Sequence, residues 1–81
     1  MGGMDRTLIL AHREQTLWRI SEGEKLIAHQ KELVSRCRKA GLSTDRAVVL
    51  LRPLEAAQAS HTDCLARIER RLALSPDLLR D

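Results

Sequence analysis

Apolar residues recur at the three- and four-residue spacing of an α-helix in two long stretches of this chain, separated by a short break. The first stretch places aliphatic side chains on one helical face, and a neighbouring column widens that face. The seam comprises Leu17, Ile20, Ile27, Val34 and Cys37, and the neighbouring column comprises Leu26, Leu33 and Ala40. This pattern predicts a helix over about residues 7–40, preceded by a disordered tail at residues 1–6.

The break between the two stretches carries the signals of a helix end followed at once by a helix start. Arg36, Arg38 and Lys39 stand in the expected last turn, where cations complement the helix dipole. Gly41 follows at the position that favours a left-handed residue in a Schellman-type stop. Ser43 and Thr44 are both candidate caps of the next helix. Two helices joined by so short a turn should form an antiparallel hairpin.

The second stretch predicts a helix over about residues 44–73, with a loose C-terminal tail at residues 74–81. Its apolar face is wider than a two-column coiled-coil seam, and such a face suits a helix that contacts two neighbours. The three columns are Ala47, Leu54, His61 and Ile68; Leu50, Ala57 and Cys64; and Leu51, Gln58, Leu65 and Leu72.

Pro53 lies inside the second stretch and removes one amide donor from any helix that contains it. The apolar period continues across it from Leu50 to Leu54, so we expect a kink near Pro53 within one helix. The alternative is that Pro53 starts a separate helix. Gly23 interrupts the first seam, either to let a neighbouring helix approach or as a tolerated imperfection.

Counting outward from the turn gives a register for the hairpin. It places Val34 near Leu51, Ile27 near Gln58, Ile20 near Leu65 and Leu17 near Ile68. In this register Cys37 and Cys64 lie several turns apart, so one hairpin cannot join them in a disulfide.

Two helices alone leave part of both apolar faces in water, which favours self-association into a dimeric four-helix bundle. Trp18 lies off the main seam, and tryptophan is enriched in interfaces. The alternatives are a ring lying flat along its own helix, or a different protein covering this face. The residues expected to mediate folding and self-association are Leu17, Trp18, Ile20, Leu26, Ile27, Leu33, Val34, Leu51, Leu54, Leu65 and Ile68.

Composition narrows the function classes. The 81 residues suffice for one domain, and they include one Trp and no Phe or Tyr, which is typical of helix-rich chains. A deep catalytic cleft is hard to build at this size. No apolar run approaches the roughly 20 residues that span a bilayer. With no export signal the expected location is the cytoplasm, with both cysteines as free thiols.

Catalytic, metal and cofactor sites are not expected. His61 and Cys64 are three residues apart, but a structural zinc site needs four ligands. Glu22 and Glu24 point in different directions on a helix and do not form an acid–base pair. No phosphate-binding loop or nucleophile elbow is present. We therefore expect a non-enzymatic interaction or scaffold protein.

The alternative function is that of a small basic regulatory protein associated with nucleic acid. The formal net charge is +3, and cations gather toward both ends of the expected hairpin. The possible phosphate contacts are Arg36, Arg38, Lys39, Arg46, Arg67, Arg70 and Arg71. Interleaved acids and the lack of stacking aromatics make nucleic acid the less favoured partner.

The segments EGEKLIAHQKELV (residues 22–34) and LEAAQASHTDCL (residues 54–65) resemble small uncharacterised helical-hairpin proteins of alphaproteobacteria. The pair Leu50-Leu51 early in the second helix matches that pattern, whereas Pro53 departs from it. The resemblance covers about Leu17 to Leu72. It implies a bacterial, cytosolic helical hairpin and supplies no function, cofactor or site residue.

Overall fold

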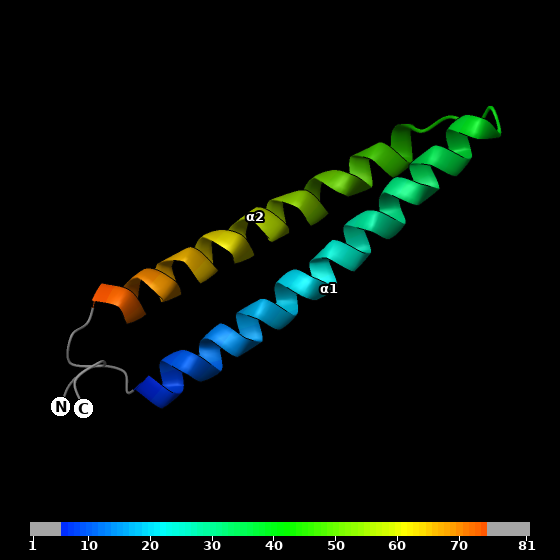
Figure 1. Cartoon of the computed structure of the whole chain (residues 1–81). Helices are drawn as coiled ribbons and strands as arrows, with labels where there is room; N and C mark the ends of the chain where they lie inside the picture. Colours follow the sequence, from blue (N-terminus) through cyan, green and yellow to red (C-terminus); the bar gives the residue numbers. More distant parts are fainter. Residues whose placement is uncertain (1–5, 75–81) are drawn as a thin grey trace.

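The computed structural model describes residues 6–74, which form two antiparallel helices, α1 (Arg6–Lys39) and α2 (Asp45–Leu74) (Figure 1). Both helices begin and end within one residue of the predicted positions, and the described part contains no strand. The all-α hairpin is therefore confirmed. Arg6 and Leu74 belong to helices rather than to the predicted tails, and the rest of those tails lies outside the described residues.

The turn between the helices is the predicted Schellman-type stop. Gly41 has a φ of 74°, the left-handed conformation that glycine adopts without a Cβ clash. The Leu42 N–H donates to the Cys37 carbonyl at 2.8 Å, and the Gly41 N–H donates to the Arg38 carbonyl at 3.1 Å. The Ser43 hydroxyl then accepts a hydrogen bond from the Asp45 N–H at 3.3 Å, which caps the start of α2.

Pro53 lies inside α2, and the helix runs through it without interruption (Figure 1). A separate helix starting at Pro53 is therefore wrong. The ring is on the exposed side of the hairpin, away from α1, so it crowds no interhelical contact. The kink expected at this point stays a prediction.

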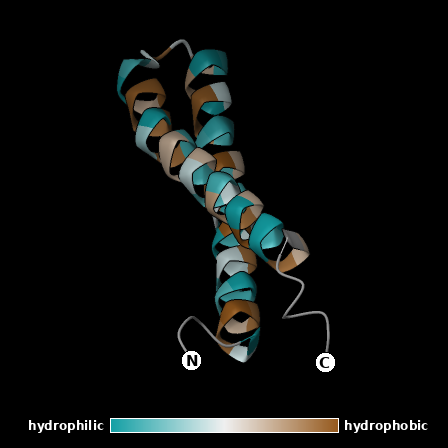
Figure 2. Cartoon of the chain, turned by 90° about the vertical axis from the view of Figure 1, so that its left-hand side faces the viewer, coloured by the Kyte–Doolittle hydropathy of each residue, from teal (hydrophilic) through white to brown (hydrophobic). Residues whose placement is uncertain are grey.

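The hairpin is a rod that measures 61 × 16 × 14 Å. Its radius of gyration is 18.3 Å, whereas a compact domain of this length would have roughly 12 Å. The helices cross each other in the side view, and hydrophobic segments recur along both of them (Figure 2). A rod of two helices has little interior in which to place those segments.

The register of the hairpin differs from the predicted one by about one turn. Gln58 lies against Gly23 and donates from Nε2 to the Ile20 carbonyl at 2.9 Å, instead of lying beside Ile27. Likewise Ile68 lies with Ile9 rather than with Leu17. Because both helices are continuous, the predicted pairs Val34–Leu51 and Ile20–Leu65 are displaced in the same way. The cause is the turn, which runs back beside the end of α1 before α2 begins (Figure 1).

The core is very small. Among the described residues, the buried hydrophobic side chains are Ile9, Val34 and Ile68, and Thr16 is the only buried polar one. The Thr16 hydroxyl donates to the His12 carbonyl at 2.8 Å, so its polar group is satisfied within its own helix. Leu17 is 36% exposed, and its predicted place in the seam is wrong because Thr16 takes that position.

Candidate interaction surface

One side of the hairpin carries apolar side chains from both helices, and we call it the open flank. It is defined by one column of seven-residue spacing on each helix, with Trp18 beside the first column and lining the same groove. The columns are Arg19, Leu26 and Leu33 on α1, and Leu50, Ala57 and Cys64 on α2. Its centre is a groove of about 220 Å³ between the helices. Trp18, Leu26, Leu54 and Ala57 are among the residues that line this groove.

The large side chains of the open flank are substantially in contact with solvent. Trp18 is 63% exposed, Leu26 is 55% exposed and Leu50 is 56% exposed. The exposure of Trp18 argues against shielding by neighbouring side chains. Trp18 also borders a hollow beside Ala11 and Gln15 of its own helix, so a ring lying along that helix stays a prediction. Exposed apolar side chains gathered on one face mark an interaction site more often than scattered single ones do.

Two polar atoms lie beneath this groove without a hydrogen-bond partner in the described part of the chain. They are Oε1 of Gln58 and Nδ1 of His61. The Gln58 amide is held in place because its Nε2 bonds the Ile20 carbonyl. Buried polar atoms that lack a partner destabilise a fold, so the layer of Gln58 and His61 is a weak point of the isolated hairpin.

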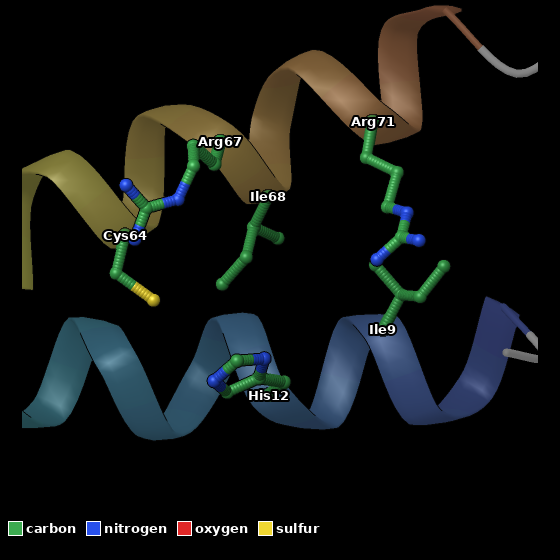
Figure 3. A pocket seen from close by; sticks show the side chains of 6 residues that line it. All are labelled: Ile9, His12, Cys64, Arg67, Ile68 and Arg71. Carbon is green, nitrogen blue, oxygen red and sulfur yellow. The ribbon is translucent and has the colours of Figure 1, made fainter.

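A second hollow lies at the end of the hairpin opposite the turn, which we call the open end, next to the open flank (Figure 3). It has a volume of about 300 Å³, and the buried side chains of Ile9 and Ile68 form its apolar part. Arg67 and Arg71 reach over it from α2, and neither forms an ion pair with another described residue. Within the described residues, two cations without an ion-pair partner therefore lie above an apolar floor at this end.

The same hollow contains one histidine and one cysteine, His12 and Cys64, from opposite helices (Figure 3). Within residues 6–74, no cluster of three or more His, Cys, Asp or Glu side chains is positioned to hold a metal ion. Two ligands are fewer than a structural zinc site requires. Both cysteines are half-buried free thiols.

The opposite side of the hairpin, which we call the closed flank, is mixed in character. Arg13 and Glu69 form an ion pair across the helices at 3.0 Å, with side chains 38% and 49% exposed. Helical periodicity places charged residues between the apolar ones on this face. Its residues are Leu10, Leu17, Glu24 and Lys31 on α1, and Val48, Glu55, Thr62 and Glu69 on α2.

A third hollow, of about 370 Å³, lies near the turn and is lined by Asp45, Arg46, Val49 and Leu50. Val49 is 57% exposed, so this hollow extends the apolar surface of the open flank along the outside of α2. The extension ends at the charged residues of the turn.

The predicted interface residues divide among three places. Trp18, Leu26 and Leu33 lie on the open flank, and Leu17 lies on the closed flank. The remaining predicted residues are buried or half-buried between α1 and α2, and they are Ile20, Ile27, Val34, Leu51, Leu54, Leu65 and Ile68. The sequence reasoning missed Ile9 and Thr16 in the core, and it did not assign Leu50, Ala57 and Cys64 to the surface. The seven-residue spacing of that last column was the available signal.

The candidate phosphate contacts do not form one surface. The cations at the turn end are Arg36, Arg38, Lys39 and Arg46, whereas Arg67, Arg70 and Arg71 lie at the other end of the 61 Å rod. At the turn end Arg36 already approaches Glu32 at 3.9 Å. A single nucleic-acid strand would therefore meet two separate basic ends with acidic residues between them.

Neither helix in the described part of the chain combines the length and apolarity needed to cross a membrane. Comparisons with protein-family models, with curated proteins and with solved structures found no match. The resemblance to alphaproteobacterial hairpin proteins accordingly stays a prediction.

Proposed function

We propose that this protein is a non-enzymatic helical hairpin that self-associates through its open flank and acts as a protein–protein interaction or scaffold module. The observation that carries the proposal is the imbalance in the described residues between three buried hydrophobic side chains and the exposed Trp18, Leu26 and Leu50 on one face. A hairpin with so small a core is marginal by itself.

Covering the open flank would supply the missing burial. Full burial of one large apolar side chain contributes roughly 1.5–3 kcal/mol, so several half-exposed side chains on each copy yield a substantial gain. A standard interface removes about 800 Å² from each partner. The residues that define the open flank span roughly 22 Å along each helix, which is about a third of the 61 Å rod. An interface of that area would therefore also cover side chains next to the flank.

The dimeric four-helix bundle is the arrangement that we favour. Two hairpins packed flank against flank give each helix two neighbours, as the wide apolar face of α2 suggests. A two-fold axis allows the same patch to serve on both copies, so one apolar face is sufficient. The nucleic-acid alternative has less support, because its cations are divided between the two ends of the rod.

The experiment is to measure the molar mass of the purified chain by light scattering across a dilution series, with helix content followed by circular dichroism. We expect twice the 9.2 kDa chain mass at high concentration, and a melting temperature that rises with concentration, since association stabilises the folded state. A helical monomer with a concentration-independent melting temperature contradicts the proposal.

A further inference from the structure

We propose that the second copy docks on the open flank with its turn pointing in the opposite direction, around a two-fold axis that passes beside Leu26. This inference rests on the proposed self-association and specifies the orientation and centre of the dimer. In this arrangement α1 packs on α1 of the second copy, and α2 packs on α2.

The distribution of apolar side chains along the rod places the axis. Gln58 contacts Gly23, and Leu26 and Leu54 lie three and four residues from that contact toward the turn, so they share roughly one level of the hairpin. Trp18 precedes Leu26 on α1, and Leu33 follows it, each at roughly 11 Å along the helix. Reversing the rod about Leu26 therefore brings Trp18 of each copy to the level of Leu33 of the other. The apolar side chains of the flank on one copy therefore face the apolar side chains of the same flank on the other copy.

The same reversal suits the side chains of α2. Leu50 lies near the level of Gln30, because the Gln30 amide donates to the Ala47 carbonyl at 2.9 Å. Ala57 lies on the other side of Leu54, at the groove. The reversed copy therefore sets the large Leu50 against the small Ala57, on both sides of the axis. Large against small side chains at facing positions is the packing that helix bundles use.

Charge favours the reversed orientation over the alternative with both turns at one end. Arg36, Arg38, Lys39 and Arg46 crowd the turn end, and a dimer with both turns together would double that cluster. Reversal instead brings each cluster to the half of the second copy in which Glu14, Asp63 and Glu69 are interspersed with the basic residues of that end, so the turn-end cations gain acidic neighbours. Neither Glu14 nor Asp63 forms an ion pair in the described part of the chain, so both are available to these cations.

The two native cysteines allow a direct measurement of the orientation. Cys64 shares a hollow with His12 near the open end, and Cys37 lies near the turn, so they are on opposite sides of Leu26 at similar distances. Two variants, Cys37→Ser and Cys64→Ser, each leave one thiol for a nitroxide spin label. Pulsed electron paramagnetic resonance then gives the distance between the two labels of the dimer.

The reversed dimer predicts roughly 30 Å between labels in both variants, since each label lies roughly 15 Å along the rod from the axis. A dimer with both turns at one end predicts labels separated only by the thickness of the bundle, under roughly 20 Å in both. The short distances would overturn the inference while leaving self-association intact. A dimer by light scattering with neither distance would also overturn it, by placing the contact on another face.

A label on Cys64 would lie on the open flank itself, so a third labelling site away from the groove serves as a control. In the Cys37→Ser/Cys64→Ser background, Lys39→Cys places a thiol on an exposed position of α1 away from the groove. The reversed dimer predicts roughly 40 Å for this site, and a shorter distance contradicts it. A monomer in all three variants and in the unlabelled chain would remove both this inference and the proposed function.

Discussion

The two flanks of the hairpin are built from the same helices and the same seven-residue spacing, yet they differ in what they present to a partner. On the closed flank the leucines of α1 share the face with Glu24, Glu55 and Glu69, and the ion pair between Arg13 and Glu69 spans it. The open flank has no ion pair between the helices among the described residues, and Trp18 and Leu26 border a groove there.

The difference shows that helical spacing by itself does not locate an interface. Leu17, expected in the seam of the first helix, and Leu26, expected in the column beside it, are 36% and 55% exposed. What distinguishes them is the helix opposite. Leu26 meets Leu54 and Ala57 across the groove, whereas the face of Leu17 is shared with carboxylates.

The largest effect is expected from a charge introduced on each flank in turn. Leu26→Glu would place two carboxylates beside the proposed two-fold axis without a partner, so we expect the dimer dissociation constant to rise by a hundredfold or more, equivalent to about 3 kcal/mol. Leu17→Glu is the matched control and should change the dimer dissociation constant by less than about fivefold. Sedimentation equilibrium measures both. Equal effects of the two variants would mean that the flanks are equivalent.

The next largest effect is expected from the single tryptophan. Trp18→Ala should weaken the dimer about 30-fold, as truncation of an interface hot spot does, while the helix content of the monomer stays unchanged because Trp18 is 63% exposed in the hairpin. The fluorescence of the unmodified chain offers a second readout. Its emission maximum should move to shorter wavelength as concentration rises, and a maximum independent of concentration would place Trp18 outside the interface.

Gly23→Ala perturbs the groove of the open flank from the side of the helix contact. The added Cβ would meet Oε1 of Gln58, and the displaced amide would lose its bond to the Ile20 carbonyl. We expect a loss of about 1 kcal/mol of unfolding free energy, after the gain in helix propensity is included.

The control is the double variant Gly23→Ala/Gln58→Ala, which is compared with Gln58→Ala alone by urea unfolding. Once the amide is removed, Gly23→Ala should become neutral or stabilising, because only the propensity gain remains. Additive effects in the double variant would show that Gly23 and Gln58 do not interact.

The smallest effect is expected on the closed flank. Glu69→Gln removes the ion pair with Arg13, whose two side chains are 49% and 38% exposed, so we expect a change below about 0.5 kcal/mol that vanishes at high salt. Thermal unfolding at two ionic strengths measures it. A loss above 1 kcal/mol would show that this pair, and not the apolar groove, holds the helices in place.

The local structure followed from the sequence because its signals are local. Gly41, the cations before it and the caps after it fix the turn within a few residues, and the apolar period fixes both helices within one residue. The interhelical register could not be predicted in the same way. It depends on the path of the turn and on the contact of Gln58 with Gly23, and neither appears in a hydropathy pattern.

The core and the surface were also hard to separate from the pattern alone. A buried threonine looks polar in sequence, and Thr16 is buried because its hydroxyl bonds the carbonyl one turn earlier. Leu50 looks like core, but its column lies at the edge of the contact between α1 and α2, where Leu50 is 56% exposed. The predicted need for a partner came from the width of the apolar face and stays to be tested.

Two glutamine side chains form hydrogen bonds between the helices and fix the position of one helix along the other. Gln58 bonds the backbone at Ile20, and Gln30 bonds it at Ala47, so sliding one helix along the other breaks both bonds together. The hairpin can therefore tolerate extra length only as whole heptads added to both helices outside the segment between these two hydrogen bonds. A single inserted residue would rotate every later side chain by about 100°.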